Sequence, residues 1–223
     1  MSTNKSERNP DAAFPSGRRG PGRPRDLEKR EAILAAASAL FSERGIAATT
    51  MDLVAERAGA AKMTIYAHFA DKPALLAAVF ERNTRDIRLP EFAEGEDLPS
   101  SLAHLNEFGE WLVQFLTRPD IVKSAKTMVE SADLHPELAA AFYAAGPAAM
   151  IGRVSDFLRS ITARALLSVE EPELVAEQLV AAWLGVSQLQ QNLGVAGPPS
   201  SEAIAKRVRA ATGALARAWP ARR

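Results

Sequence analysis

The sequence contains no cysteine among its 223 residues. Disulfide bonds, thiolate zinc sites, iron–sulfur clusters and cysteine nucleophiles are therefore excluded. No hydrophobic run approaches the roughly 18 residues that a membrane-spanning helix requires. The first residues also lack the apolar stretch of a signal peptide. These absences predict a soluble, cytoplasmic protein with no membrane partner.

Aromatic residues are scarce as well, at 6% of the chain with only two tyrosines. Alanine, by contrast, occurs 43 times. Alanine is the strongest helix former, whereas strands favour β-branched and aromatic residues. The composition therefore predicts an all-α protein.

The formal net charge is zero, but the charges are unevenly distributed. Residues 1–88 carry 15 Lys and Arg against 11 Asp and Glu, and residues 89–223 carry 12 against 16. This asymmetry indicates that the front part contacts a polyanion and the rear part does not.

Composition and hydrophobic periodicity divide the chain into three parts. Residues 1–26 are rich in Pro, Gly, Ser and Arg and predict a flexible basic arm. Residues 27–88 predict a small helical domain, and the segment 88–99, rich in proline and acidic residues, predicts its boundary. Residues 89–223 predict a second all-helical domain.

The front domain begins with an apolar stripe over residues 27–44, which Gly45 ends. Thr49-Thr50 offers an N-cap for a second helix, and Gly59 ends that helix. A short helix over 62–69 follows at once. This spacing predicts a helix-turn-helix, the second helix of which could enter the major groove of DNA, although generic helical hairpins have similar spacing.

In the rear domain, three prolines mark expected helix starts, at Pro119, Pro136 and Pro172. The segment 172–191 is apolar almost all round and predicts one buried helix. Apolar residues between 204 and 219 recur at spacings of three and four, which predicts a helix-pairing seam. We expect these two elements to form a four-helix interface between two copies of the chain.

From Thr49 to Leu76 the chain reads TTMDLVAERAGAAKMTIYAHFADKPALL, and it resembles the DNA-binding domain of the TetR family over about 50 residues from Ile33. The resemblance implies a homodimeric, ligand-responsive repressor that binds a double-stranded operator. It also implies which residues contact DNA. The second helix would begin against a phosphate at Thr49 and Thr50. Base edges would be faced by Lys62, Met63 and Thr64 of the recognition helix. The DNA backbone would be held by Tyr66, His68 and Lys72.

Two positions depart from the family pattern. Ala61 stands where a small hydroxyl residue is frequent, and Ala67 stands where a larger side chain is common. Two implied contacts also have a simpler interpretation: Tyr66 as a core aromatic residue, and His68 as a surface histidine at a helix end.

The rear domain is similar to the AefR-type effector domain, through residues 127–147 and the segment PELVAEQL at 172–179. The similarity implies a small-molecule pocket among the middle helices and dimerisation through the last two. The expected pocket residues are large and apolar or aromatic, although the same stripes are also typical of plain core: Trp111, Phe115, Met128, Phe142, Tyr143, Met150 and Phe157.

The arm contains Gly-Arg-Pro-Arg at residues 22–25, which resembles an AT-hook core. Such an extended Arg-Pro-Arg segment lies in a narrow minor groove. We therefore expect Arg23 and Arg25 to contact DNA, with a solvated tail as the alternative interpretation.

Two rival functions follow from the same residues. An architectural protein would bind A·T-rich DNA through the arm and need no effector. A helical enzyme would need a metal, for which His104, Glu107 and Glu110 share the spacing of one helix face. Helix surfaces often carry such triplets by chance, so we expect no cofactor, no metal and no catalytic residue.

Overall fold

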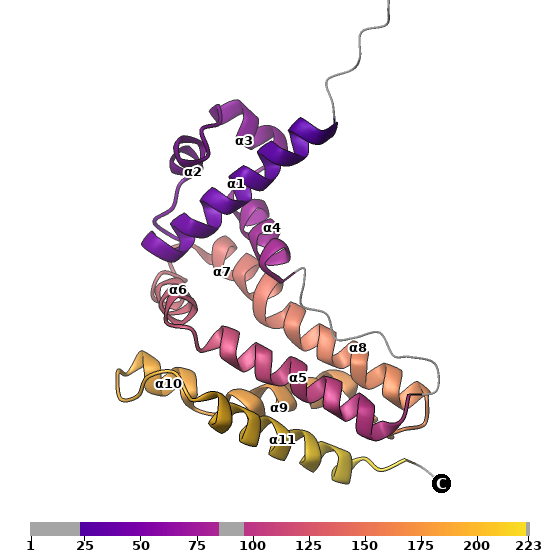
Figure 1. Ribbon diagram of the computed structural model, residues 1–223. Coiled ribbons are helices and arrows are strands. Elements are labelled where there is room, and N and C mark those ends of the chain that lie inside the picture. The colour runs from indigo at the N-terminus through magenta and orange to yellow at the C-terminus, as the bar shows by residue number, and fades with distance from the viewer. Residues whose placement is uncertain (1–22, 85–95, 222–223) are drawn as a thin grey trace, which may run out of the picture.

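The computed structural model describes residues 23–84 and 96–221, and within these ranges the regular elements are helices (Figure 1). One isolated antiparallel bridge joins Leu167 to Pro220 near the end of the chain. The predicted all-α fold is confirmed. Within the described residues, no helix is both long enough and apolar enough to cross a bilayer.

Four helices lie in the described part of the front domain, and several of their ends coincide with capping residues. Gly45 and Gly59 have positive φ angles of 85° and 61° and end the first and second helices. The backbone N–H of Ala74 donates to Asp71 Oδ1 at 2.8 Å, which caps the fourth. The four elements are α1 (Arg23–Arg44), α2 (Met51–Ala58), α3 (Lys62–His68) and α4 (Lys72–Thr84).

The rear domain is also helical, and three of its helices begin at the predicted prolines 119, 136 and 172. The first residue of a helix has no intrahelical acceptor for its N–H, so proline is well tolerated there. The elements are α5 (Leu98–Leu116), α6 (Pro119–Glu130), α7 (Pro136–Tyr143), the π-helical turn η1 (Ala144–Ala148), α8 (Ala149–Ala163), α9 (Pro172–Leu184), α10 (Ser187–Asn192) and α11 (Ser201–Ala218).

Helix α1 begins at Arg23, four residues before the predicted start at Leu27. The prediction that residues 23–25 form an extended segment is therefore wrong. Pro24 fits the first helical turn because its missing N–H would have no partner there. The remainder of the expected arm, residues 1–22, lies outside the described residues.

The predicted continuous helix over 172–191 is also wrong, because it breaks at Gly185. That residue has φ 54° and ψ −134°, which only glycine adopts readily. The guanidinium of Arg207 on α11 donates to the Leu184 carbonyl at 2.7 Å and to the Ser187 hydroxyl at 2.8 Å. These bonds satisfy a helix end, so α10 turns away from α9 and packs against α6.

The described residues form two apolar cores. The rear core lies among α5, α8, α9 and α11 and surrounds the buried Trp183. The front core lies among α1 to α4 but also includes Met128 of α6 and Leu138 of α7. In Figure 1, α6 and α7 lie between the front helices and the α5, α9 and α11 layer. The front domain is therefore packed directly on the rear domain rather than connected to it by a linker alone.

The predicted seam on α11 is occupied within one copy of the chain. Ile204, Val208 and Leu215 are buried in the rear core. Helix α11 contacts α5 and α9, which cover this face. These three residues are therefore core residues, and the expectation that they pair with a second copy is wrong.

Candidate nucleic-acid interface

The turn between α2 and α3 is built from local capping. The hydroxyl of Thr50 accepts a bond from the backbone N–H of Leu53 at 3.2 Å, which caps α2. Gly59 takes the left-handed conformation that ends it. Ile65 and Phe69 are buried in the front core, so they fix the rotation of α3.

This rotation leaves one face of α3 open to solvent. Met63 is 80% exposed and Tyr66 is 43% exposed. Lys62 and Ala67 are also exposed on this face, whereas Thr64 is only half-buried at its margin. Of the residues predicted to face base edges, Lys62 and Met63 project outward together with Tyr66.

Lys62 forms an ion pair that the sequence analysis did not predict. Its ammonium nitrogen lies 2.7 Å from Asp52 Oδ1, on the neighbouring helix α2. The hydrogen bond to Asp52 raises the pKa of Lys62. The pair joins two helices across the turn, so periodicity within either helix carries no signal for it.

Thr49 does not face the DNA side, which corrects its assignment as a DNA contact. Its side chain is buried, and its hydroxyl donates to the Gly45 carbonyl at 2.9 Å. The N-cap of α2 is Thr50, which remains exposed. Adjacent threonines thus have different roles: one closes the loop after α1 and the other begins α2.

His68 is also turned inward. Its side chain is 11% exposed, and Nε2 lies 3.4 Å from a carboxylate oxygen of Asp26 on α1. His68 would have to turn away from Asp26 to hold the DNA backbone, so this contact stays a prediction. Its position joins the end of α3 to the start of α1.

Lys72 begins α4, but its ammonium group has a partner within the chain. It donates to the Ala47 carbonyl at 2.7 Å. Burial lowers the pKa of Lys72, opposed in part by the charge of Glu137 on α7. The group would have to leave this carbonyl to bind a phosphate directly. Arg23 and Arg25 lie in the first turn of α1, and their DNA contacts stay a prediction.

A bidentate ion pair that the sequence analysis missed joins α2 of the helix-turn-helix to α1. The guanidinium of Arg57 on α2 donates to both carboxylate oxygens of Glu43 on α1, at 3.0 and 2.8 Å. The hydrogen bond to Arg57 lowers the pKa of Glu43. This geometry holds α2 at a defined angle to α1.

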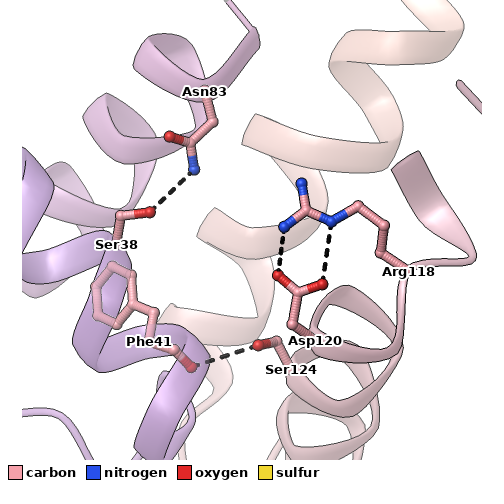
Figure 2. A network of polar contacts seen from close by, with 6 residues as sticks. All are labelled: Ser38, Phe41, Asn83, Arg118, Asp120 and Ser124. Carbon is pink, nitrogen blue, oxygen red and sulfur yellow. Dashed lines mark hydrogen bonds and ion pairs between the residues drawn. The ribbon is translucent and has the colours of Figure 1, made fainter. Parts of the chain in front are cut away.

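Figure 2 shows polar contacts where the front domain meets the rear domain. The Ser124 hydroxyl of α6 donates to the Phe41 carbonyl of α1 at 3.3 Å. The Asn83 amide of α4 donates to the Ser38 hydroxyl of α1 at 3.3 Å. Arg118 pairs with Asp120 at the start of α6. A displacement of α6 would therefore displace the end of α1 through the hydrogen bond from Ser124 to Phe41.

An aromatic contact provides a second connection between the domains. Phe80 of α4 and Phe142 of α7 meet edge to face with ring centroids 5.5 Å apart. A Cβ placed on Gly146 would lie 3.0 Å from the Phe80 ring, so this glycine allows the close approach. Helix α4 is thus packed against the α7–η1 segment.

The seven predicted effector residues do not gather in one place. Met128 and Phe142 pack with the front core, whereas Met150 and Phe157 are buried in the rear core. Trp111 and Phe115 stack on each other with centroids 5.2 Å apart, and Tyr143 is exposed. Five of the seven, Trp111 among them, are therefore packed in or against the two cores, and their contact with an effector stays a prediction.

A groove of about 360 Å³ lies elsewhere, between α6 and α10. Its lining includes none of the seven predicted residues. Apolar side chains supply most of its α6 wall, and α10 supplies amides: Val122, Ala125, Lys126, Val129, Glu130, Gln188 and Asn192.

The triplet considered as a metal site does not converge. His104 Nδ1 lies 3.0 Å from Glu96, and Glu110 pairs with Arg209 of α11 at 3.4 Å. Within the ranges that the structure covers, no group of three or more metal-ligating side chains occurs.

Comparison with known families identifies both parts of the chain. Residues 33–79 match the bacterial regulatory proteins of the tetR family. Residues 103–220 match the C-terminal domain of AefR-like transcriptional repressors. The second match alone covers more than half of the chain.

Individual relatives agree with these matches. The chain is 37% identical over 91 residues to the uncharacterised HTH-type transcriptional regulator YdeS of Bacillus subtilis (strain 168), covering 41% of this chain and 46% of that protein. It is 44% identical over 70 residues to the HTH-type transcriptional activator FasR of Mycolicibacterium smegmatis, covering 31% of this chain and 32% of that protein. The chain thus spans less than half the length of these curated relatives.

A solved structure matches over a longer range. The flavonoid-responsive regulator FrrA superposes with a TM-score of 0.67 at 29% identity, covering 88% of this chain and 100% of that one.

Proposed function

Because this chain belongs to the TetR family of DNA-binding transcriptional regulators, with an AefR-like C-terminal domain, we propose that it acts as a homodimeric repressor. It binds a palindromic operator and leaves it when a small apolar effector binds. As a regulator of chromosomal DNA, it works in the cytoplasm.

The observation that carries the proposal is the exposed face of α3. Lys62, Met63 and Tyr66 project from it, while Ile65 and Phe69 anchor the helix in the front core. A helix presented in this way fits the major groove, which is wide enough to admit it. Two copies related by a two-fold axis would read two half-sites.

Selection of bound sequences from random DNA, followed by footprinting, tests this proposal. A regulator of this kind protects a short palindrome. An architectural protein, the second candidate function, would instead coat A·T-rich DNA without a defined boundary. Broad protection of that kind would contradict an operator-specific function.

Tyr66→Phe tests the contact of α3 with the DNA backbone. If the Tyr66 hydroxyl donates to a phosphate, its removal weakens binding about tenfold per half-site, because hydrogen bonds to charged groups are strong. The loss should be similar for operator and unrelated DNA, since phosphate contacts carry no sequence information. Fluorescence anisotropy with both duplexes measures it.

Tyr143→Phe is the matched control, because the sequence contains only two tyrosines and Tyr143 is exposed at the end of α7. It should leave both affinities unchanged. Equal effects of the two substitutions would contradict the assigned role of Tyr66.

The outer faces of α9 and α11 support the dimer in this proposal. Leu174 and Ala181 are exposed on α9, and Ala203, Ala210 and Ala214 are exposed on α11. They recur at helical spacing and are mostly small, so two copies could approach closely across a two-fold axis. Sedimentation at micromolar concentration should give a dimer.

Repression is favoured over activation because the longer match is to AefR-like repressors, over residues 103–220, while the match to the activator FasR covers 70 residues. A reporter placed behind the selected operator should show lower expression when the chain is present. Higher expression of the reporter in the presence of the chain would show that it acts as an activator instead.

The groove between α6 and α10 supports the effector part of the proposal. Ala125 and Val129 line it, while Ser124 and Thr127 of the same helix contact the end of α1. A molecule in the groove would therefore act on the helix that supports the front domain. The name of the structural relative FrrA, a flavonoid-responsive regulator, makes flavonoids the first compounds to test.

Val129→Trp tests this groove. Val129 lines it and is 75% exposed, so the substitution fills the groove without disturbing a core. We expect any flavonoid or other hydrophobic compound that releases wild-type protein from its operator to need at least about tenfold higher concentration, since a filled site loses the compound's apolar contacts. Operator release is followed by anisotropy.

Leu134→Trp is the control, because Leu134 is 78% exposed but does not line the groove. It should leave the release curve in place. If Val129→Trp also leaves it in place, the effector binds elsewhere.

A further inference from the structure

The recognition helix α3 carries unusual side chains for reading bases. Residues 61–67 read AKMTIYA and include no Arg, Asn or Gln. Those three, together with Lys, are the residues that most often make bidentate hydrogen bonds to guanine or adenine in the major groove. Sequence discrimination by this helix therefore depends on Lys62 or on a different kind of contact.

Lys62 is the cation of this face, but Asp52 holds it. The ammonium nitrogen lies 2.7 Å from one carboxylate oxygen and 3.0 Å from the other. The pair has no net charge, and it turns the lysine toward α2. This arrangement leaves the apolar part of the face as its most prominent feature.

Met63 dominates that apolar part. At 80% exposure it is the most exposed large hydrophobic side chain in the described part of the chain. Ala67 lies one turn further along the same exposed face and is small. Met63 therefore has free space around its thioether, and it gains by burial against an apolar surface.

The major groove offers one such surface among the standard bases, the C5-methyl group of thymine. We propose that this chain reads thymine in its operator through Met63, which contacts the methyl group, with Ala67 leaving room for the contact. The inference rests on the proposed function, because it concerns the same operator and names the chemistry by which it is recognised.

Replacement of thymine by deoxyuridine tests this, because it removes the methyl group and leaves the hydrogen-bonding edge unchanged. Each thymine of a half-site in the selected operator is replaced in turn, and anisotropy gives the affinity. At one or two positions, wild-type protein should bind about fourfold more weakly for each methyl group removed.

Variants then assign the effect to Met63. Met63→Ala should lose this sensitivity, with less than a twofold change at the same positions, and Met63→Leu should retain it. Asp52→Asn frees Lys62 and should strengthen binding to all sequences while retaining the deoxyuridine effect. Because Met63 and Asp52 are exposed, we expect circular dichroism of these variants to match the wild type.

Two results would overturn the inference: tolerance of deoxyuridine at every position, or an undiminished effect in Met63→Ala. Either leaves the operator itself intact, so the proposed function would stand. Failure to select any sequence from random DNA is a different result, and it would overturn the proposed function together with this inference.

Discussion

Val208→Glu should unfold the rear domain rather than separate two folded subunits. Val208 is 0% exposed and lies among α5, α9 and α11. A Cβ placed on Gly109 would come within 2.9 Å of Val208 Cγ1 and 3.0 Å of the Trp183 ring, so the space around it is fully occupied. A carboxylate there loses its hydration and finds an apolar environment, which costs about 4 kcal/mol or more.

That loss is a large fraction of the 5–15 kcal/mol that stabilises a typical domain. Circular dichroism and thermal unfolding should show reduced helicity and a lowered or absent transition. Because Trp183 is fully buried against this site, its fluorescence should shift to that of an exposed indole.

Ala210→Glu is the matched control on the same helix. Ala210 is exposed, two residues from Val208 and on the other face of α11. The variant should keep its helicity but sediment as a monomer and lose operator affinity, because the charge falls in the proposed interface. A folded, monomeric Val208→Glu protein would contradict the buried position of α11.

Gly45→Ala should lower the free energy of unfolding by about 2–3 kcal/mol, because it strains the contact between the two domains. Gly45 has φ 85°, a conformation that costs a residue with a Cβ about 1–2 kcal/mol. The added Cβ would also lie 2.8 Å from Thr127 Cγ2 on α6, closer than two carbon atoms approach. Urea unfolding measures the loss of stability.

Gly59→Ala separates the two causes. Gly59 also has a positive φ, 61°, but no atom lies within 4 Å of its Cβ position. It should cost only the backbone term, about 1–2 kcal/mol. Equal losses for the two variants would show that Thr127 does not resist the added methyl group.

Thr127→Ser in the Gly45→Ala background should restore about 1 kcal/mol. Serine lacks the methyl group that collides but keeps the hydroxyl that donates to the Lys123 carbonyl. A double-mutant cycle reports the coupling free energy of the pair, because the two residues are in direct contact. No recovery in the double variant would place the strain elsewhere.

Local features of the sequence determined most of the helix boundaries. Gly45 and Gly59 end helices because a residue without a Cβ adopts a positive φ readily. The prolines at 119, 136 and 172 begin helices because the first helical residue needs no N–H donor. The spacing of α2 and α3 and the burial of Ile65 and Phe69 followed from the helical repeat. The helix-turn-helix was therefore predictable without coordinates.

The tertiary structure alone decided which polar residues of that motif are available to DNA. Thr49 and Thr50 are chemically alike, but the first is buried against the Gly45 carbonyl and the second caps α2. His68 turns toward Asp26, which is 42 positions away. Such contacts depend on the angles between helices, and periodicity within one helix does not specify those angles.

Contacts between helices, rather than periodicity within one helix, also decided the packing of the rear domain. The sequence determined that α11 has an apolar face, but either its own chain or a second copy could have covered that face. The break at Gly185, stabilised by Arg207 of α11, turns α10 toward α6 and opens a groove between them. Packing of α5 and α9 then buries Val208 within one chain, because hydrophobic burial favours any apolar partner of suitable shape and does not by itself distinguish one chain from two.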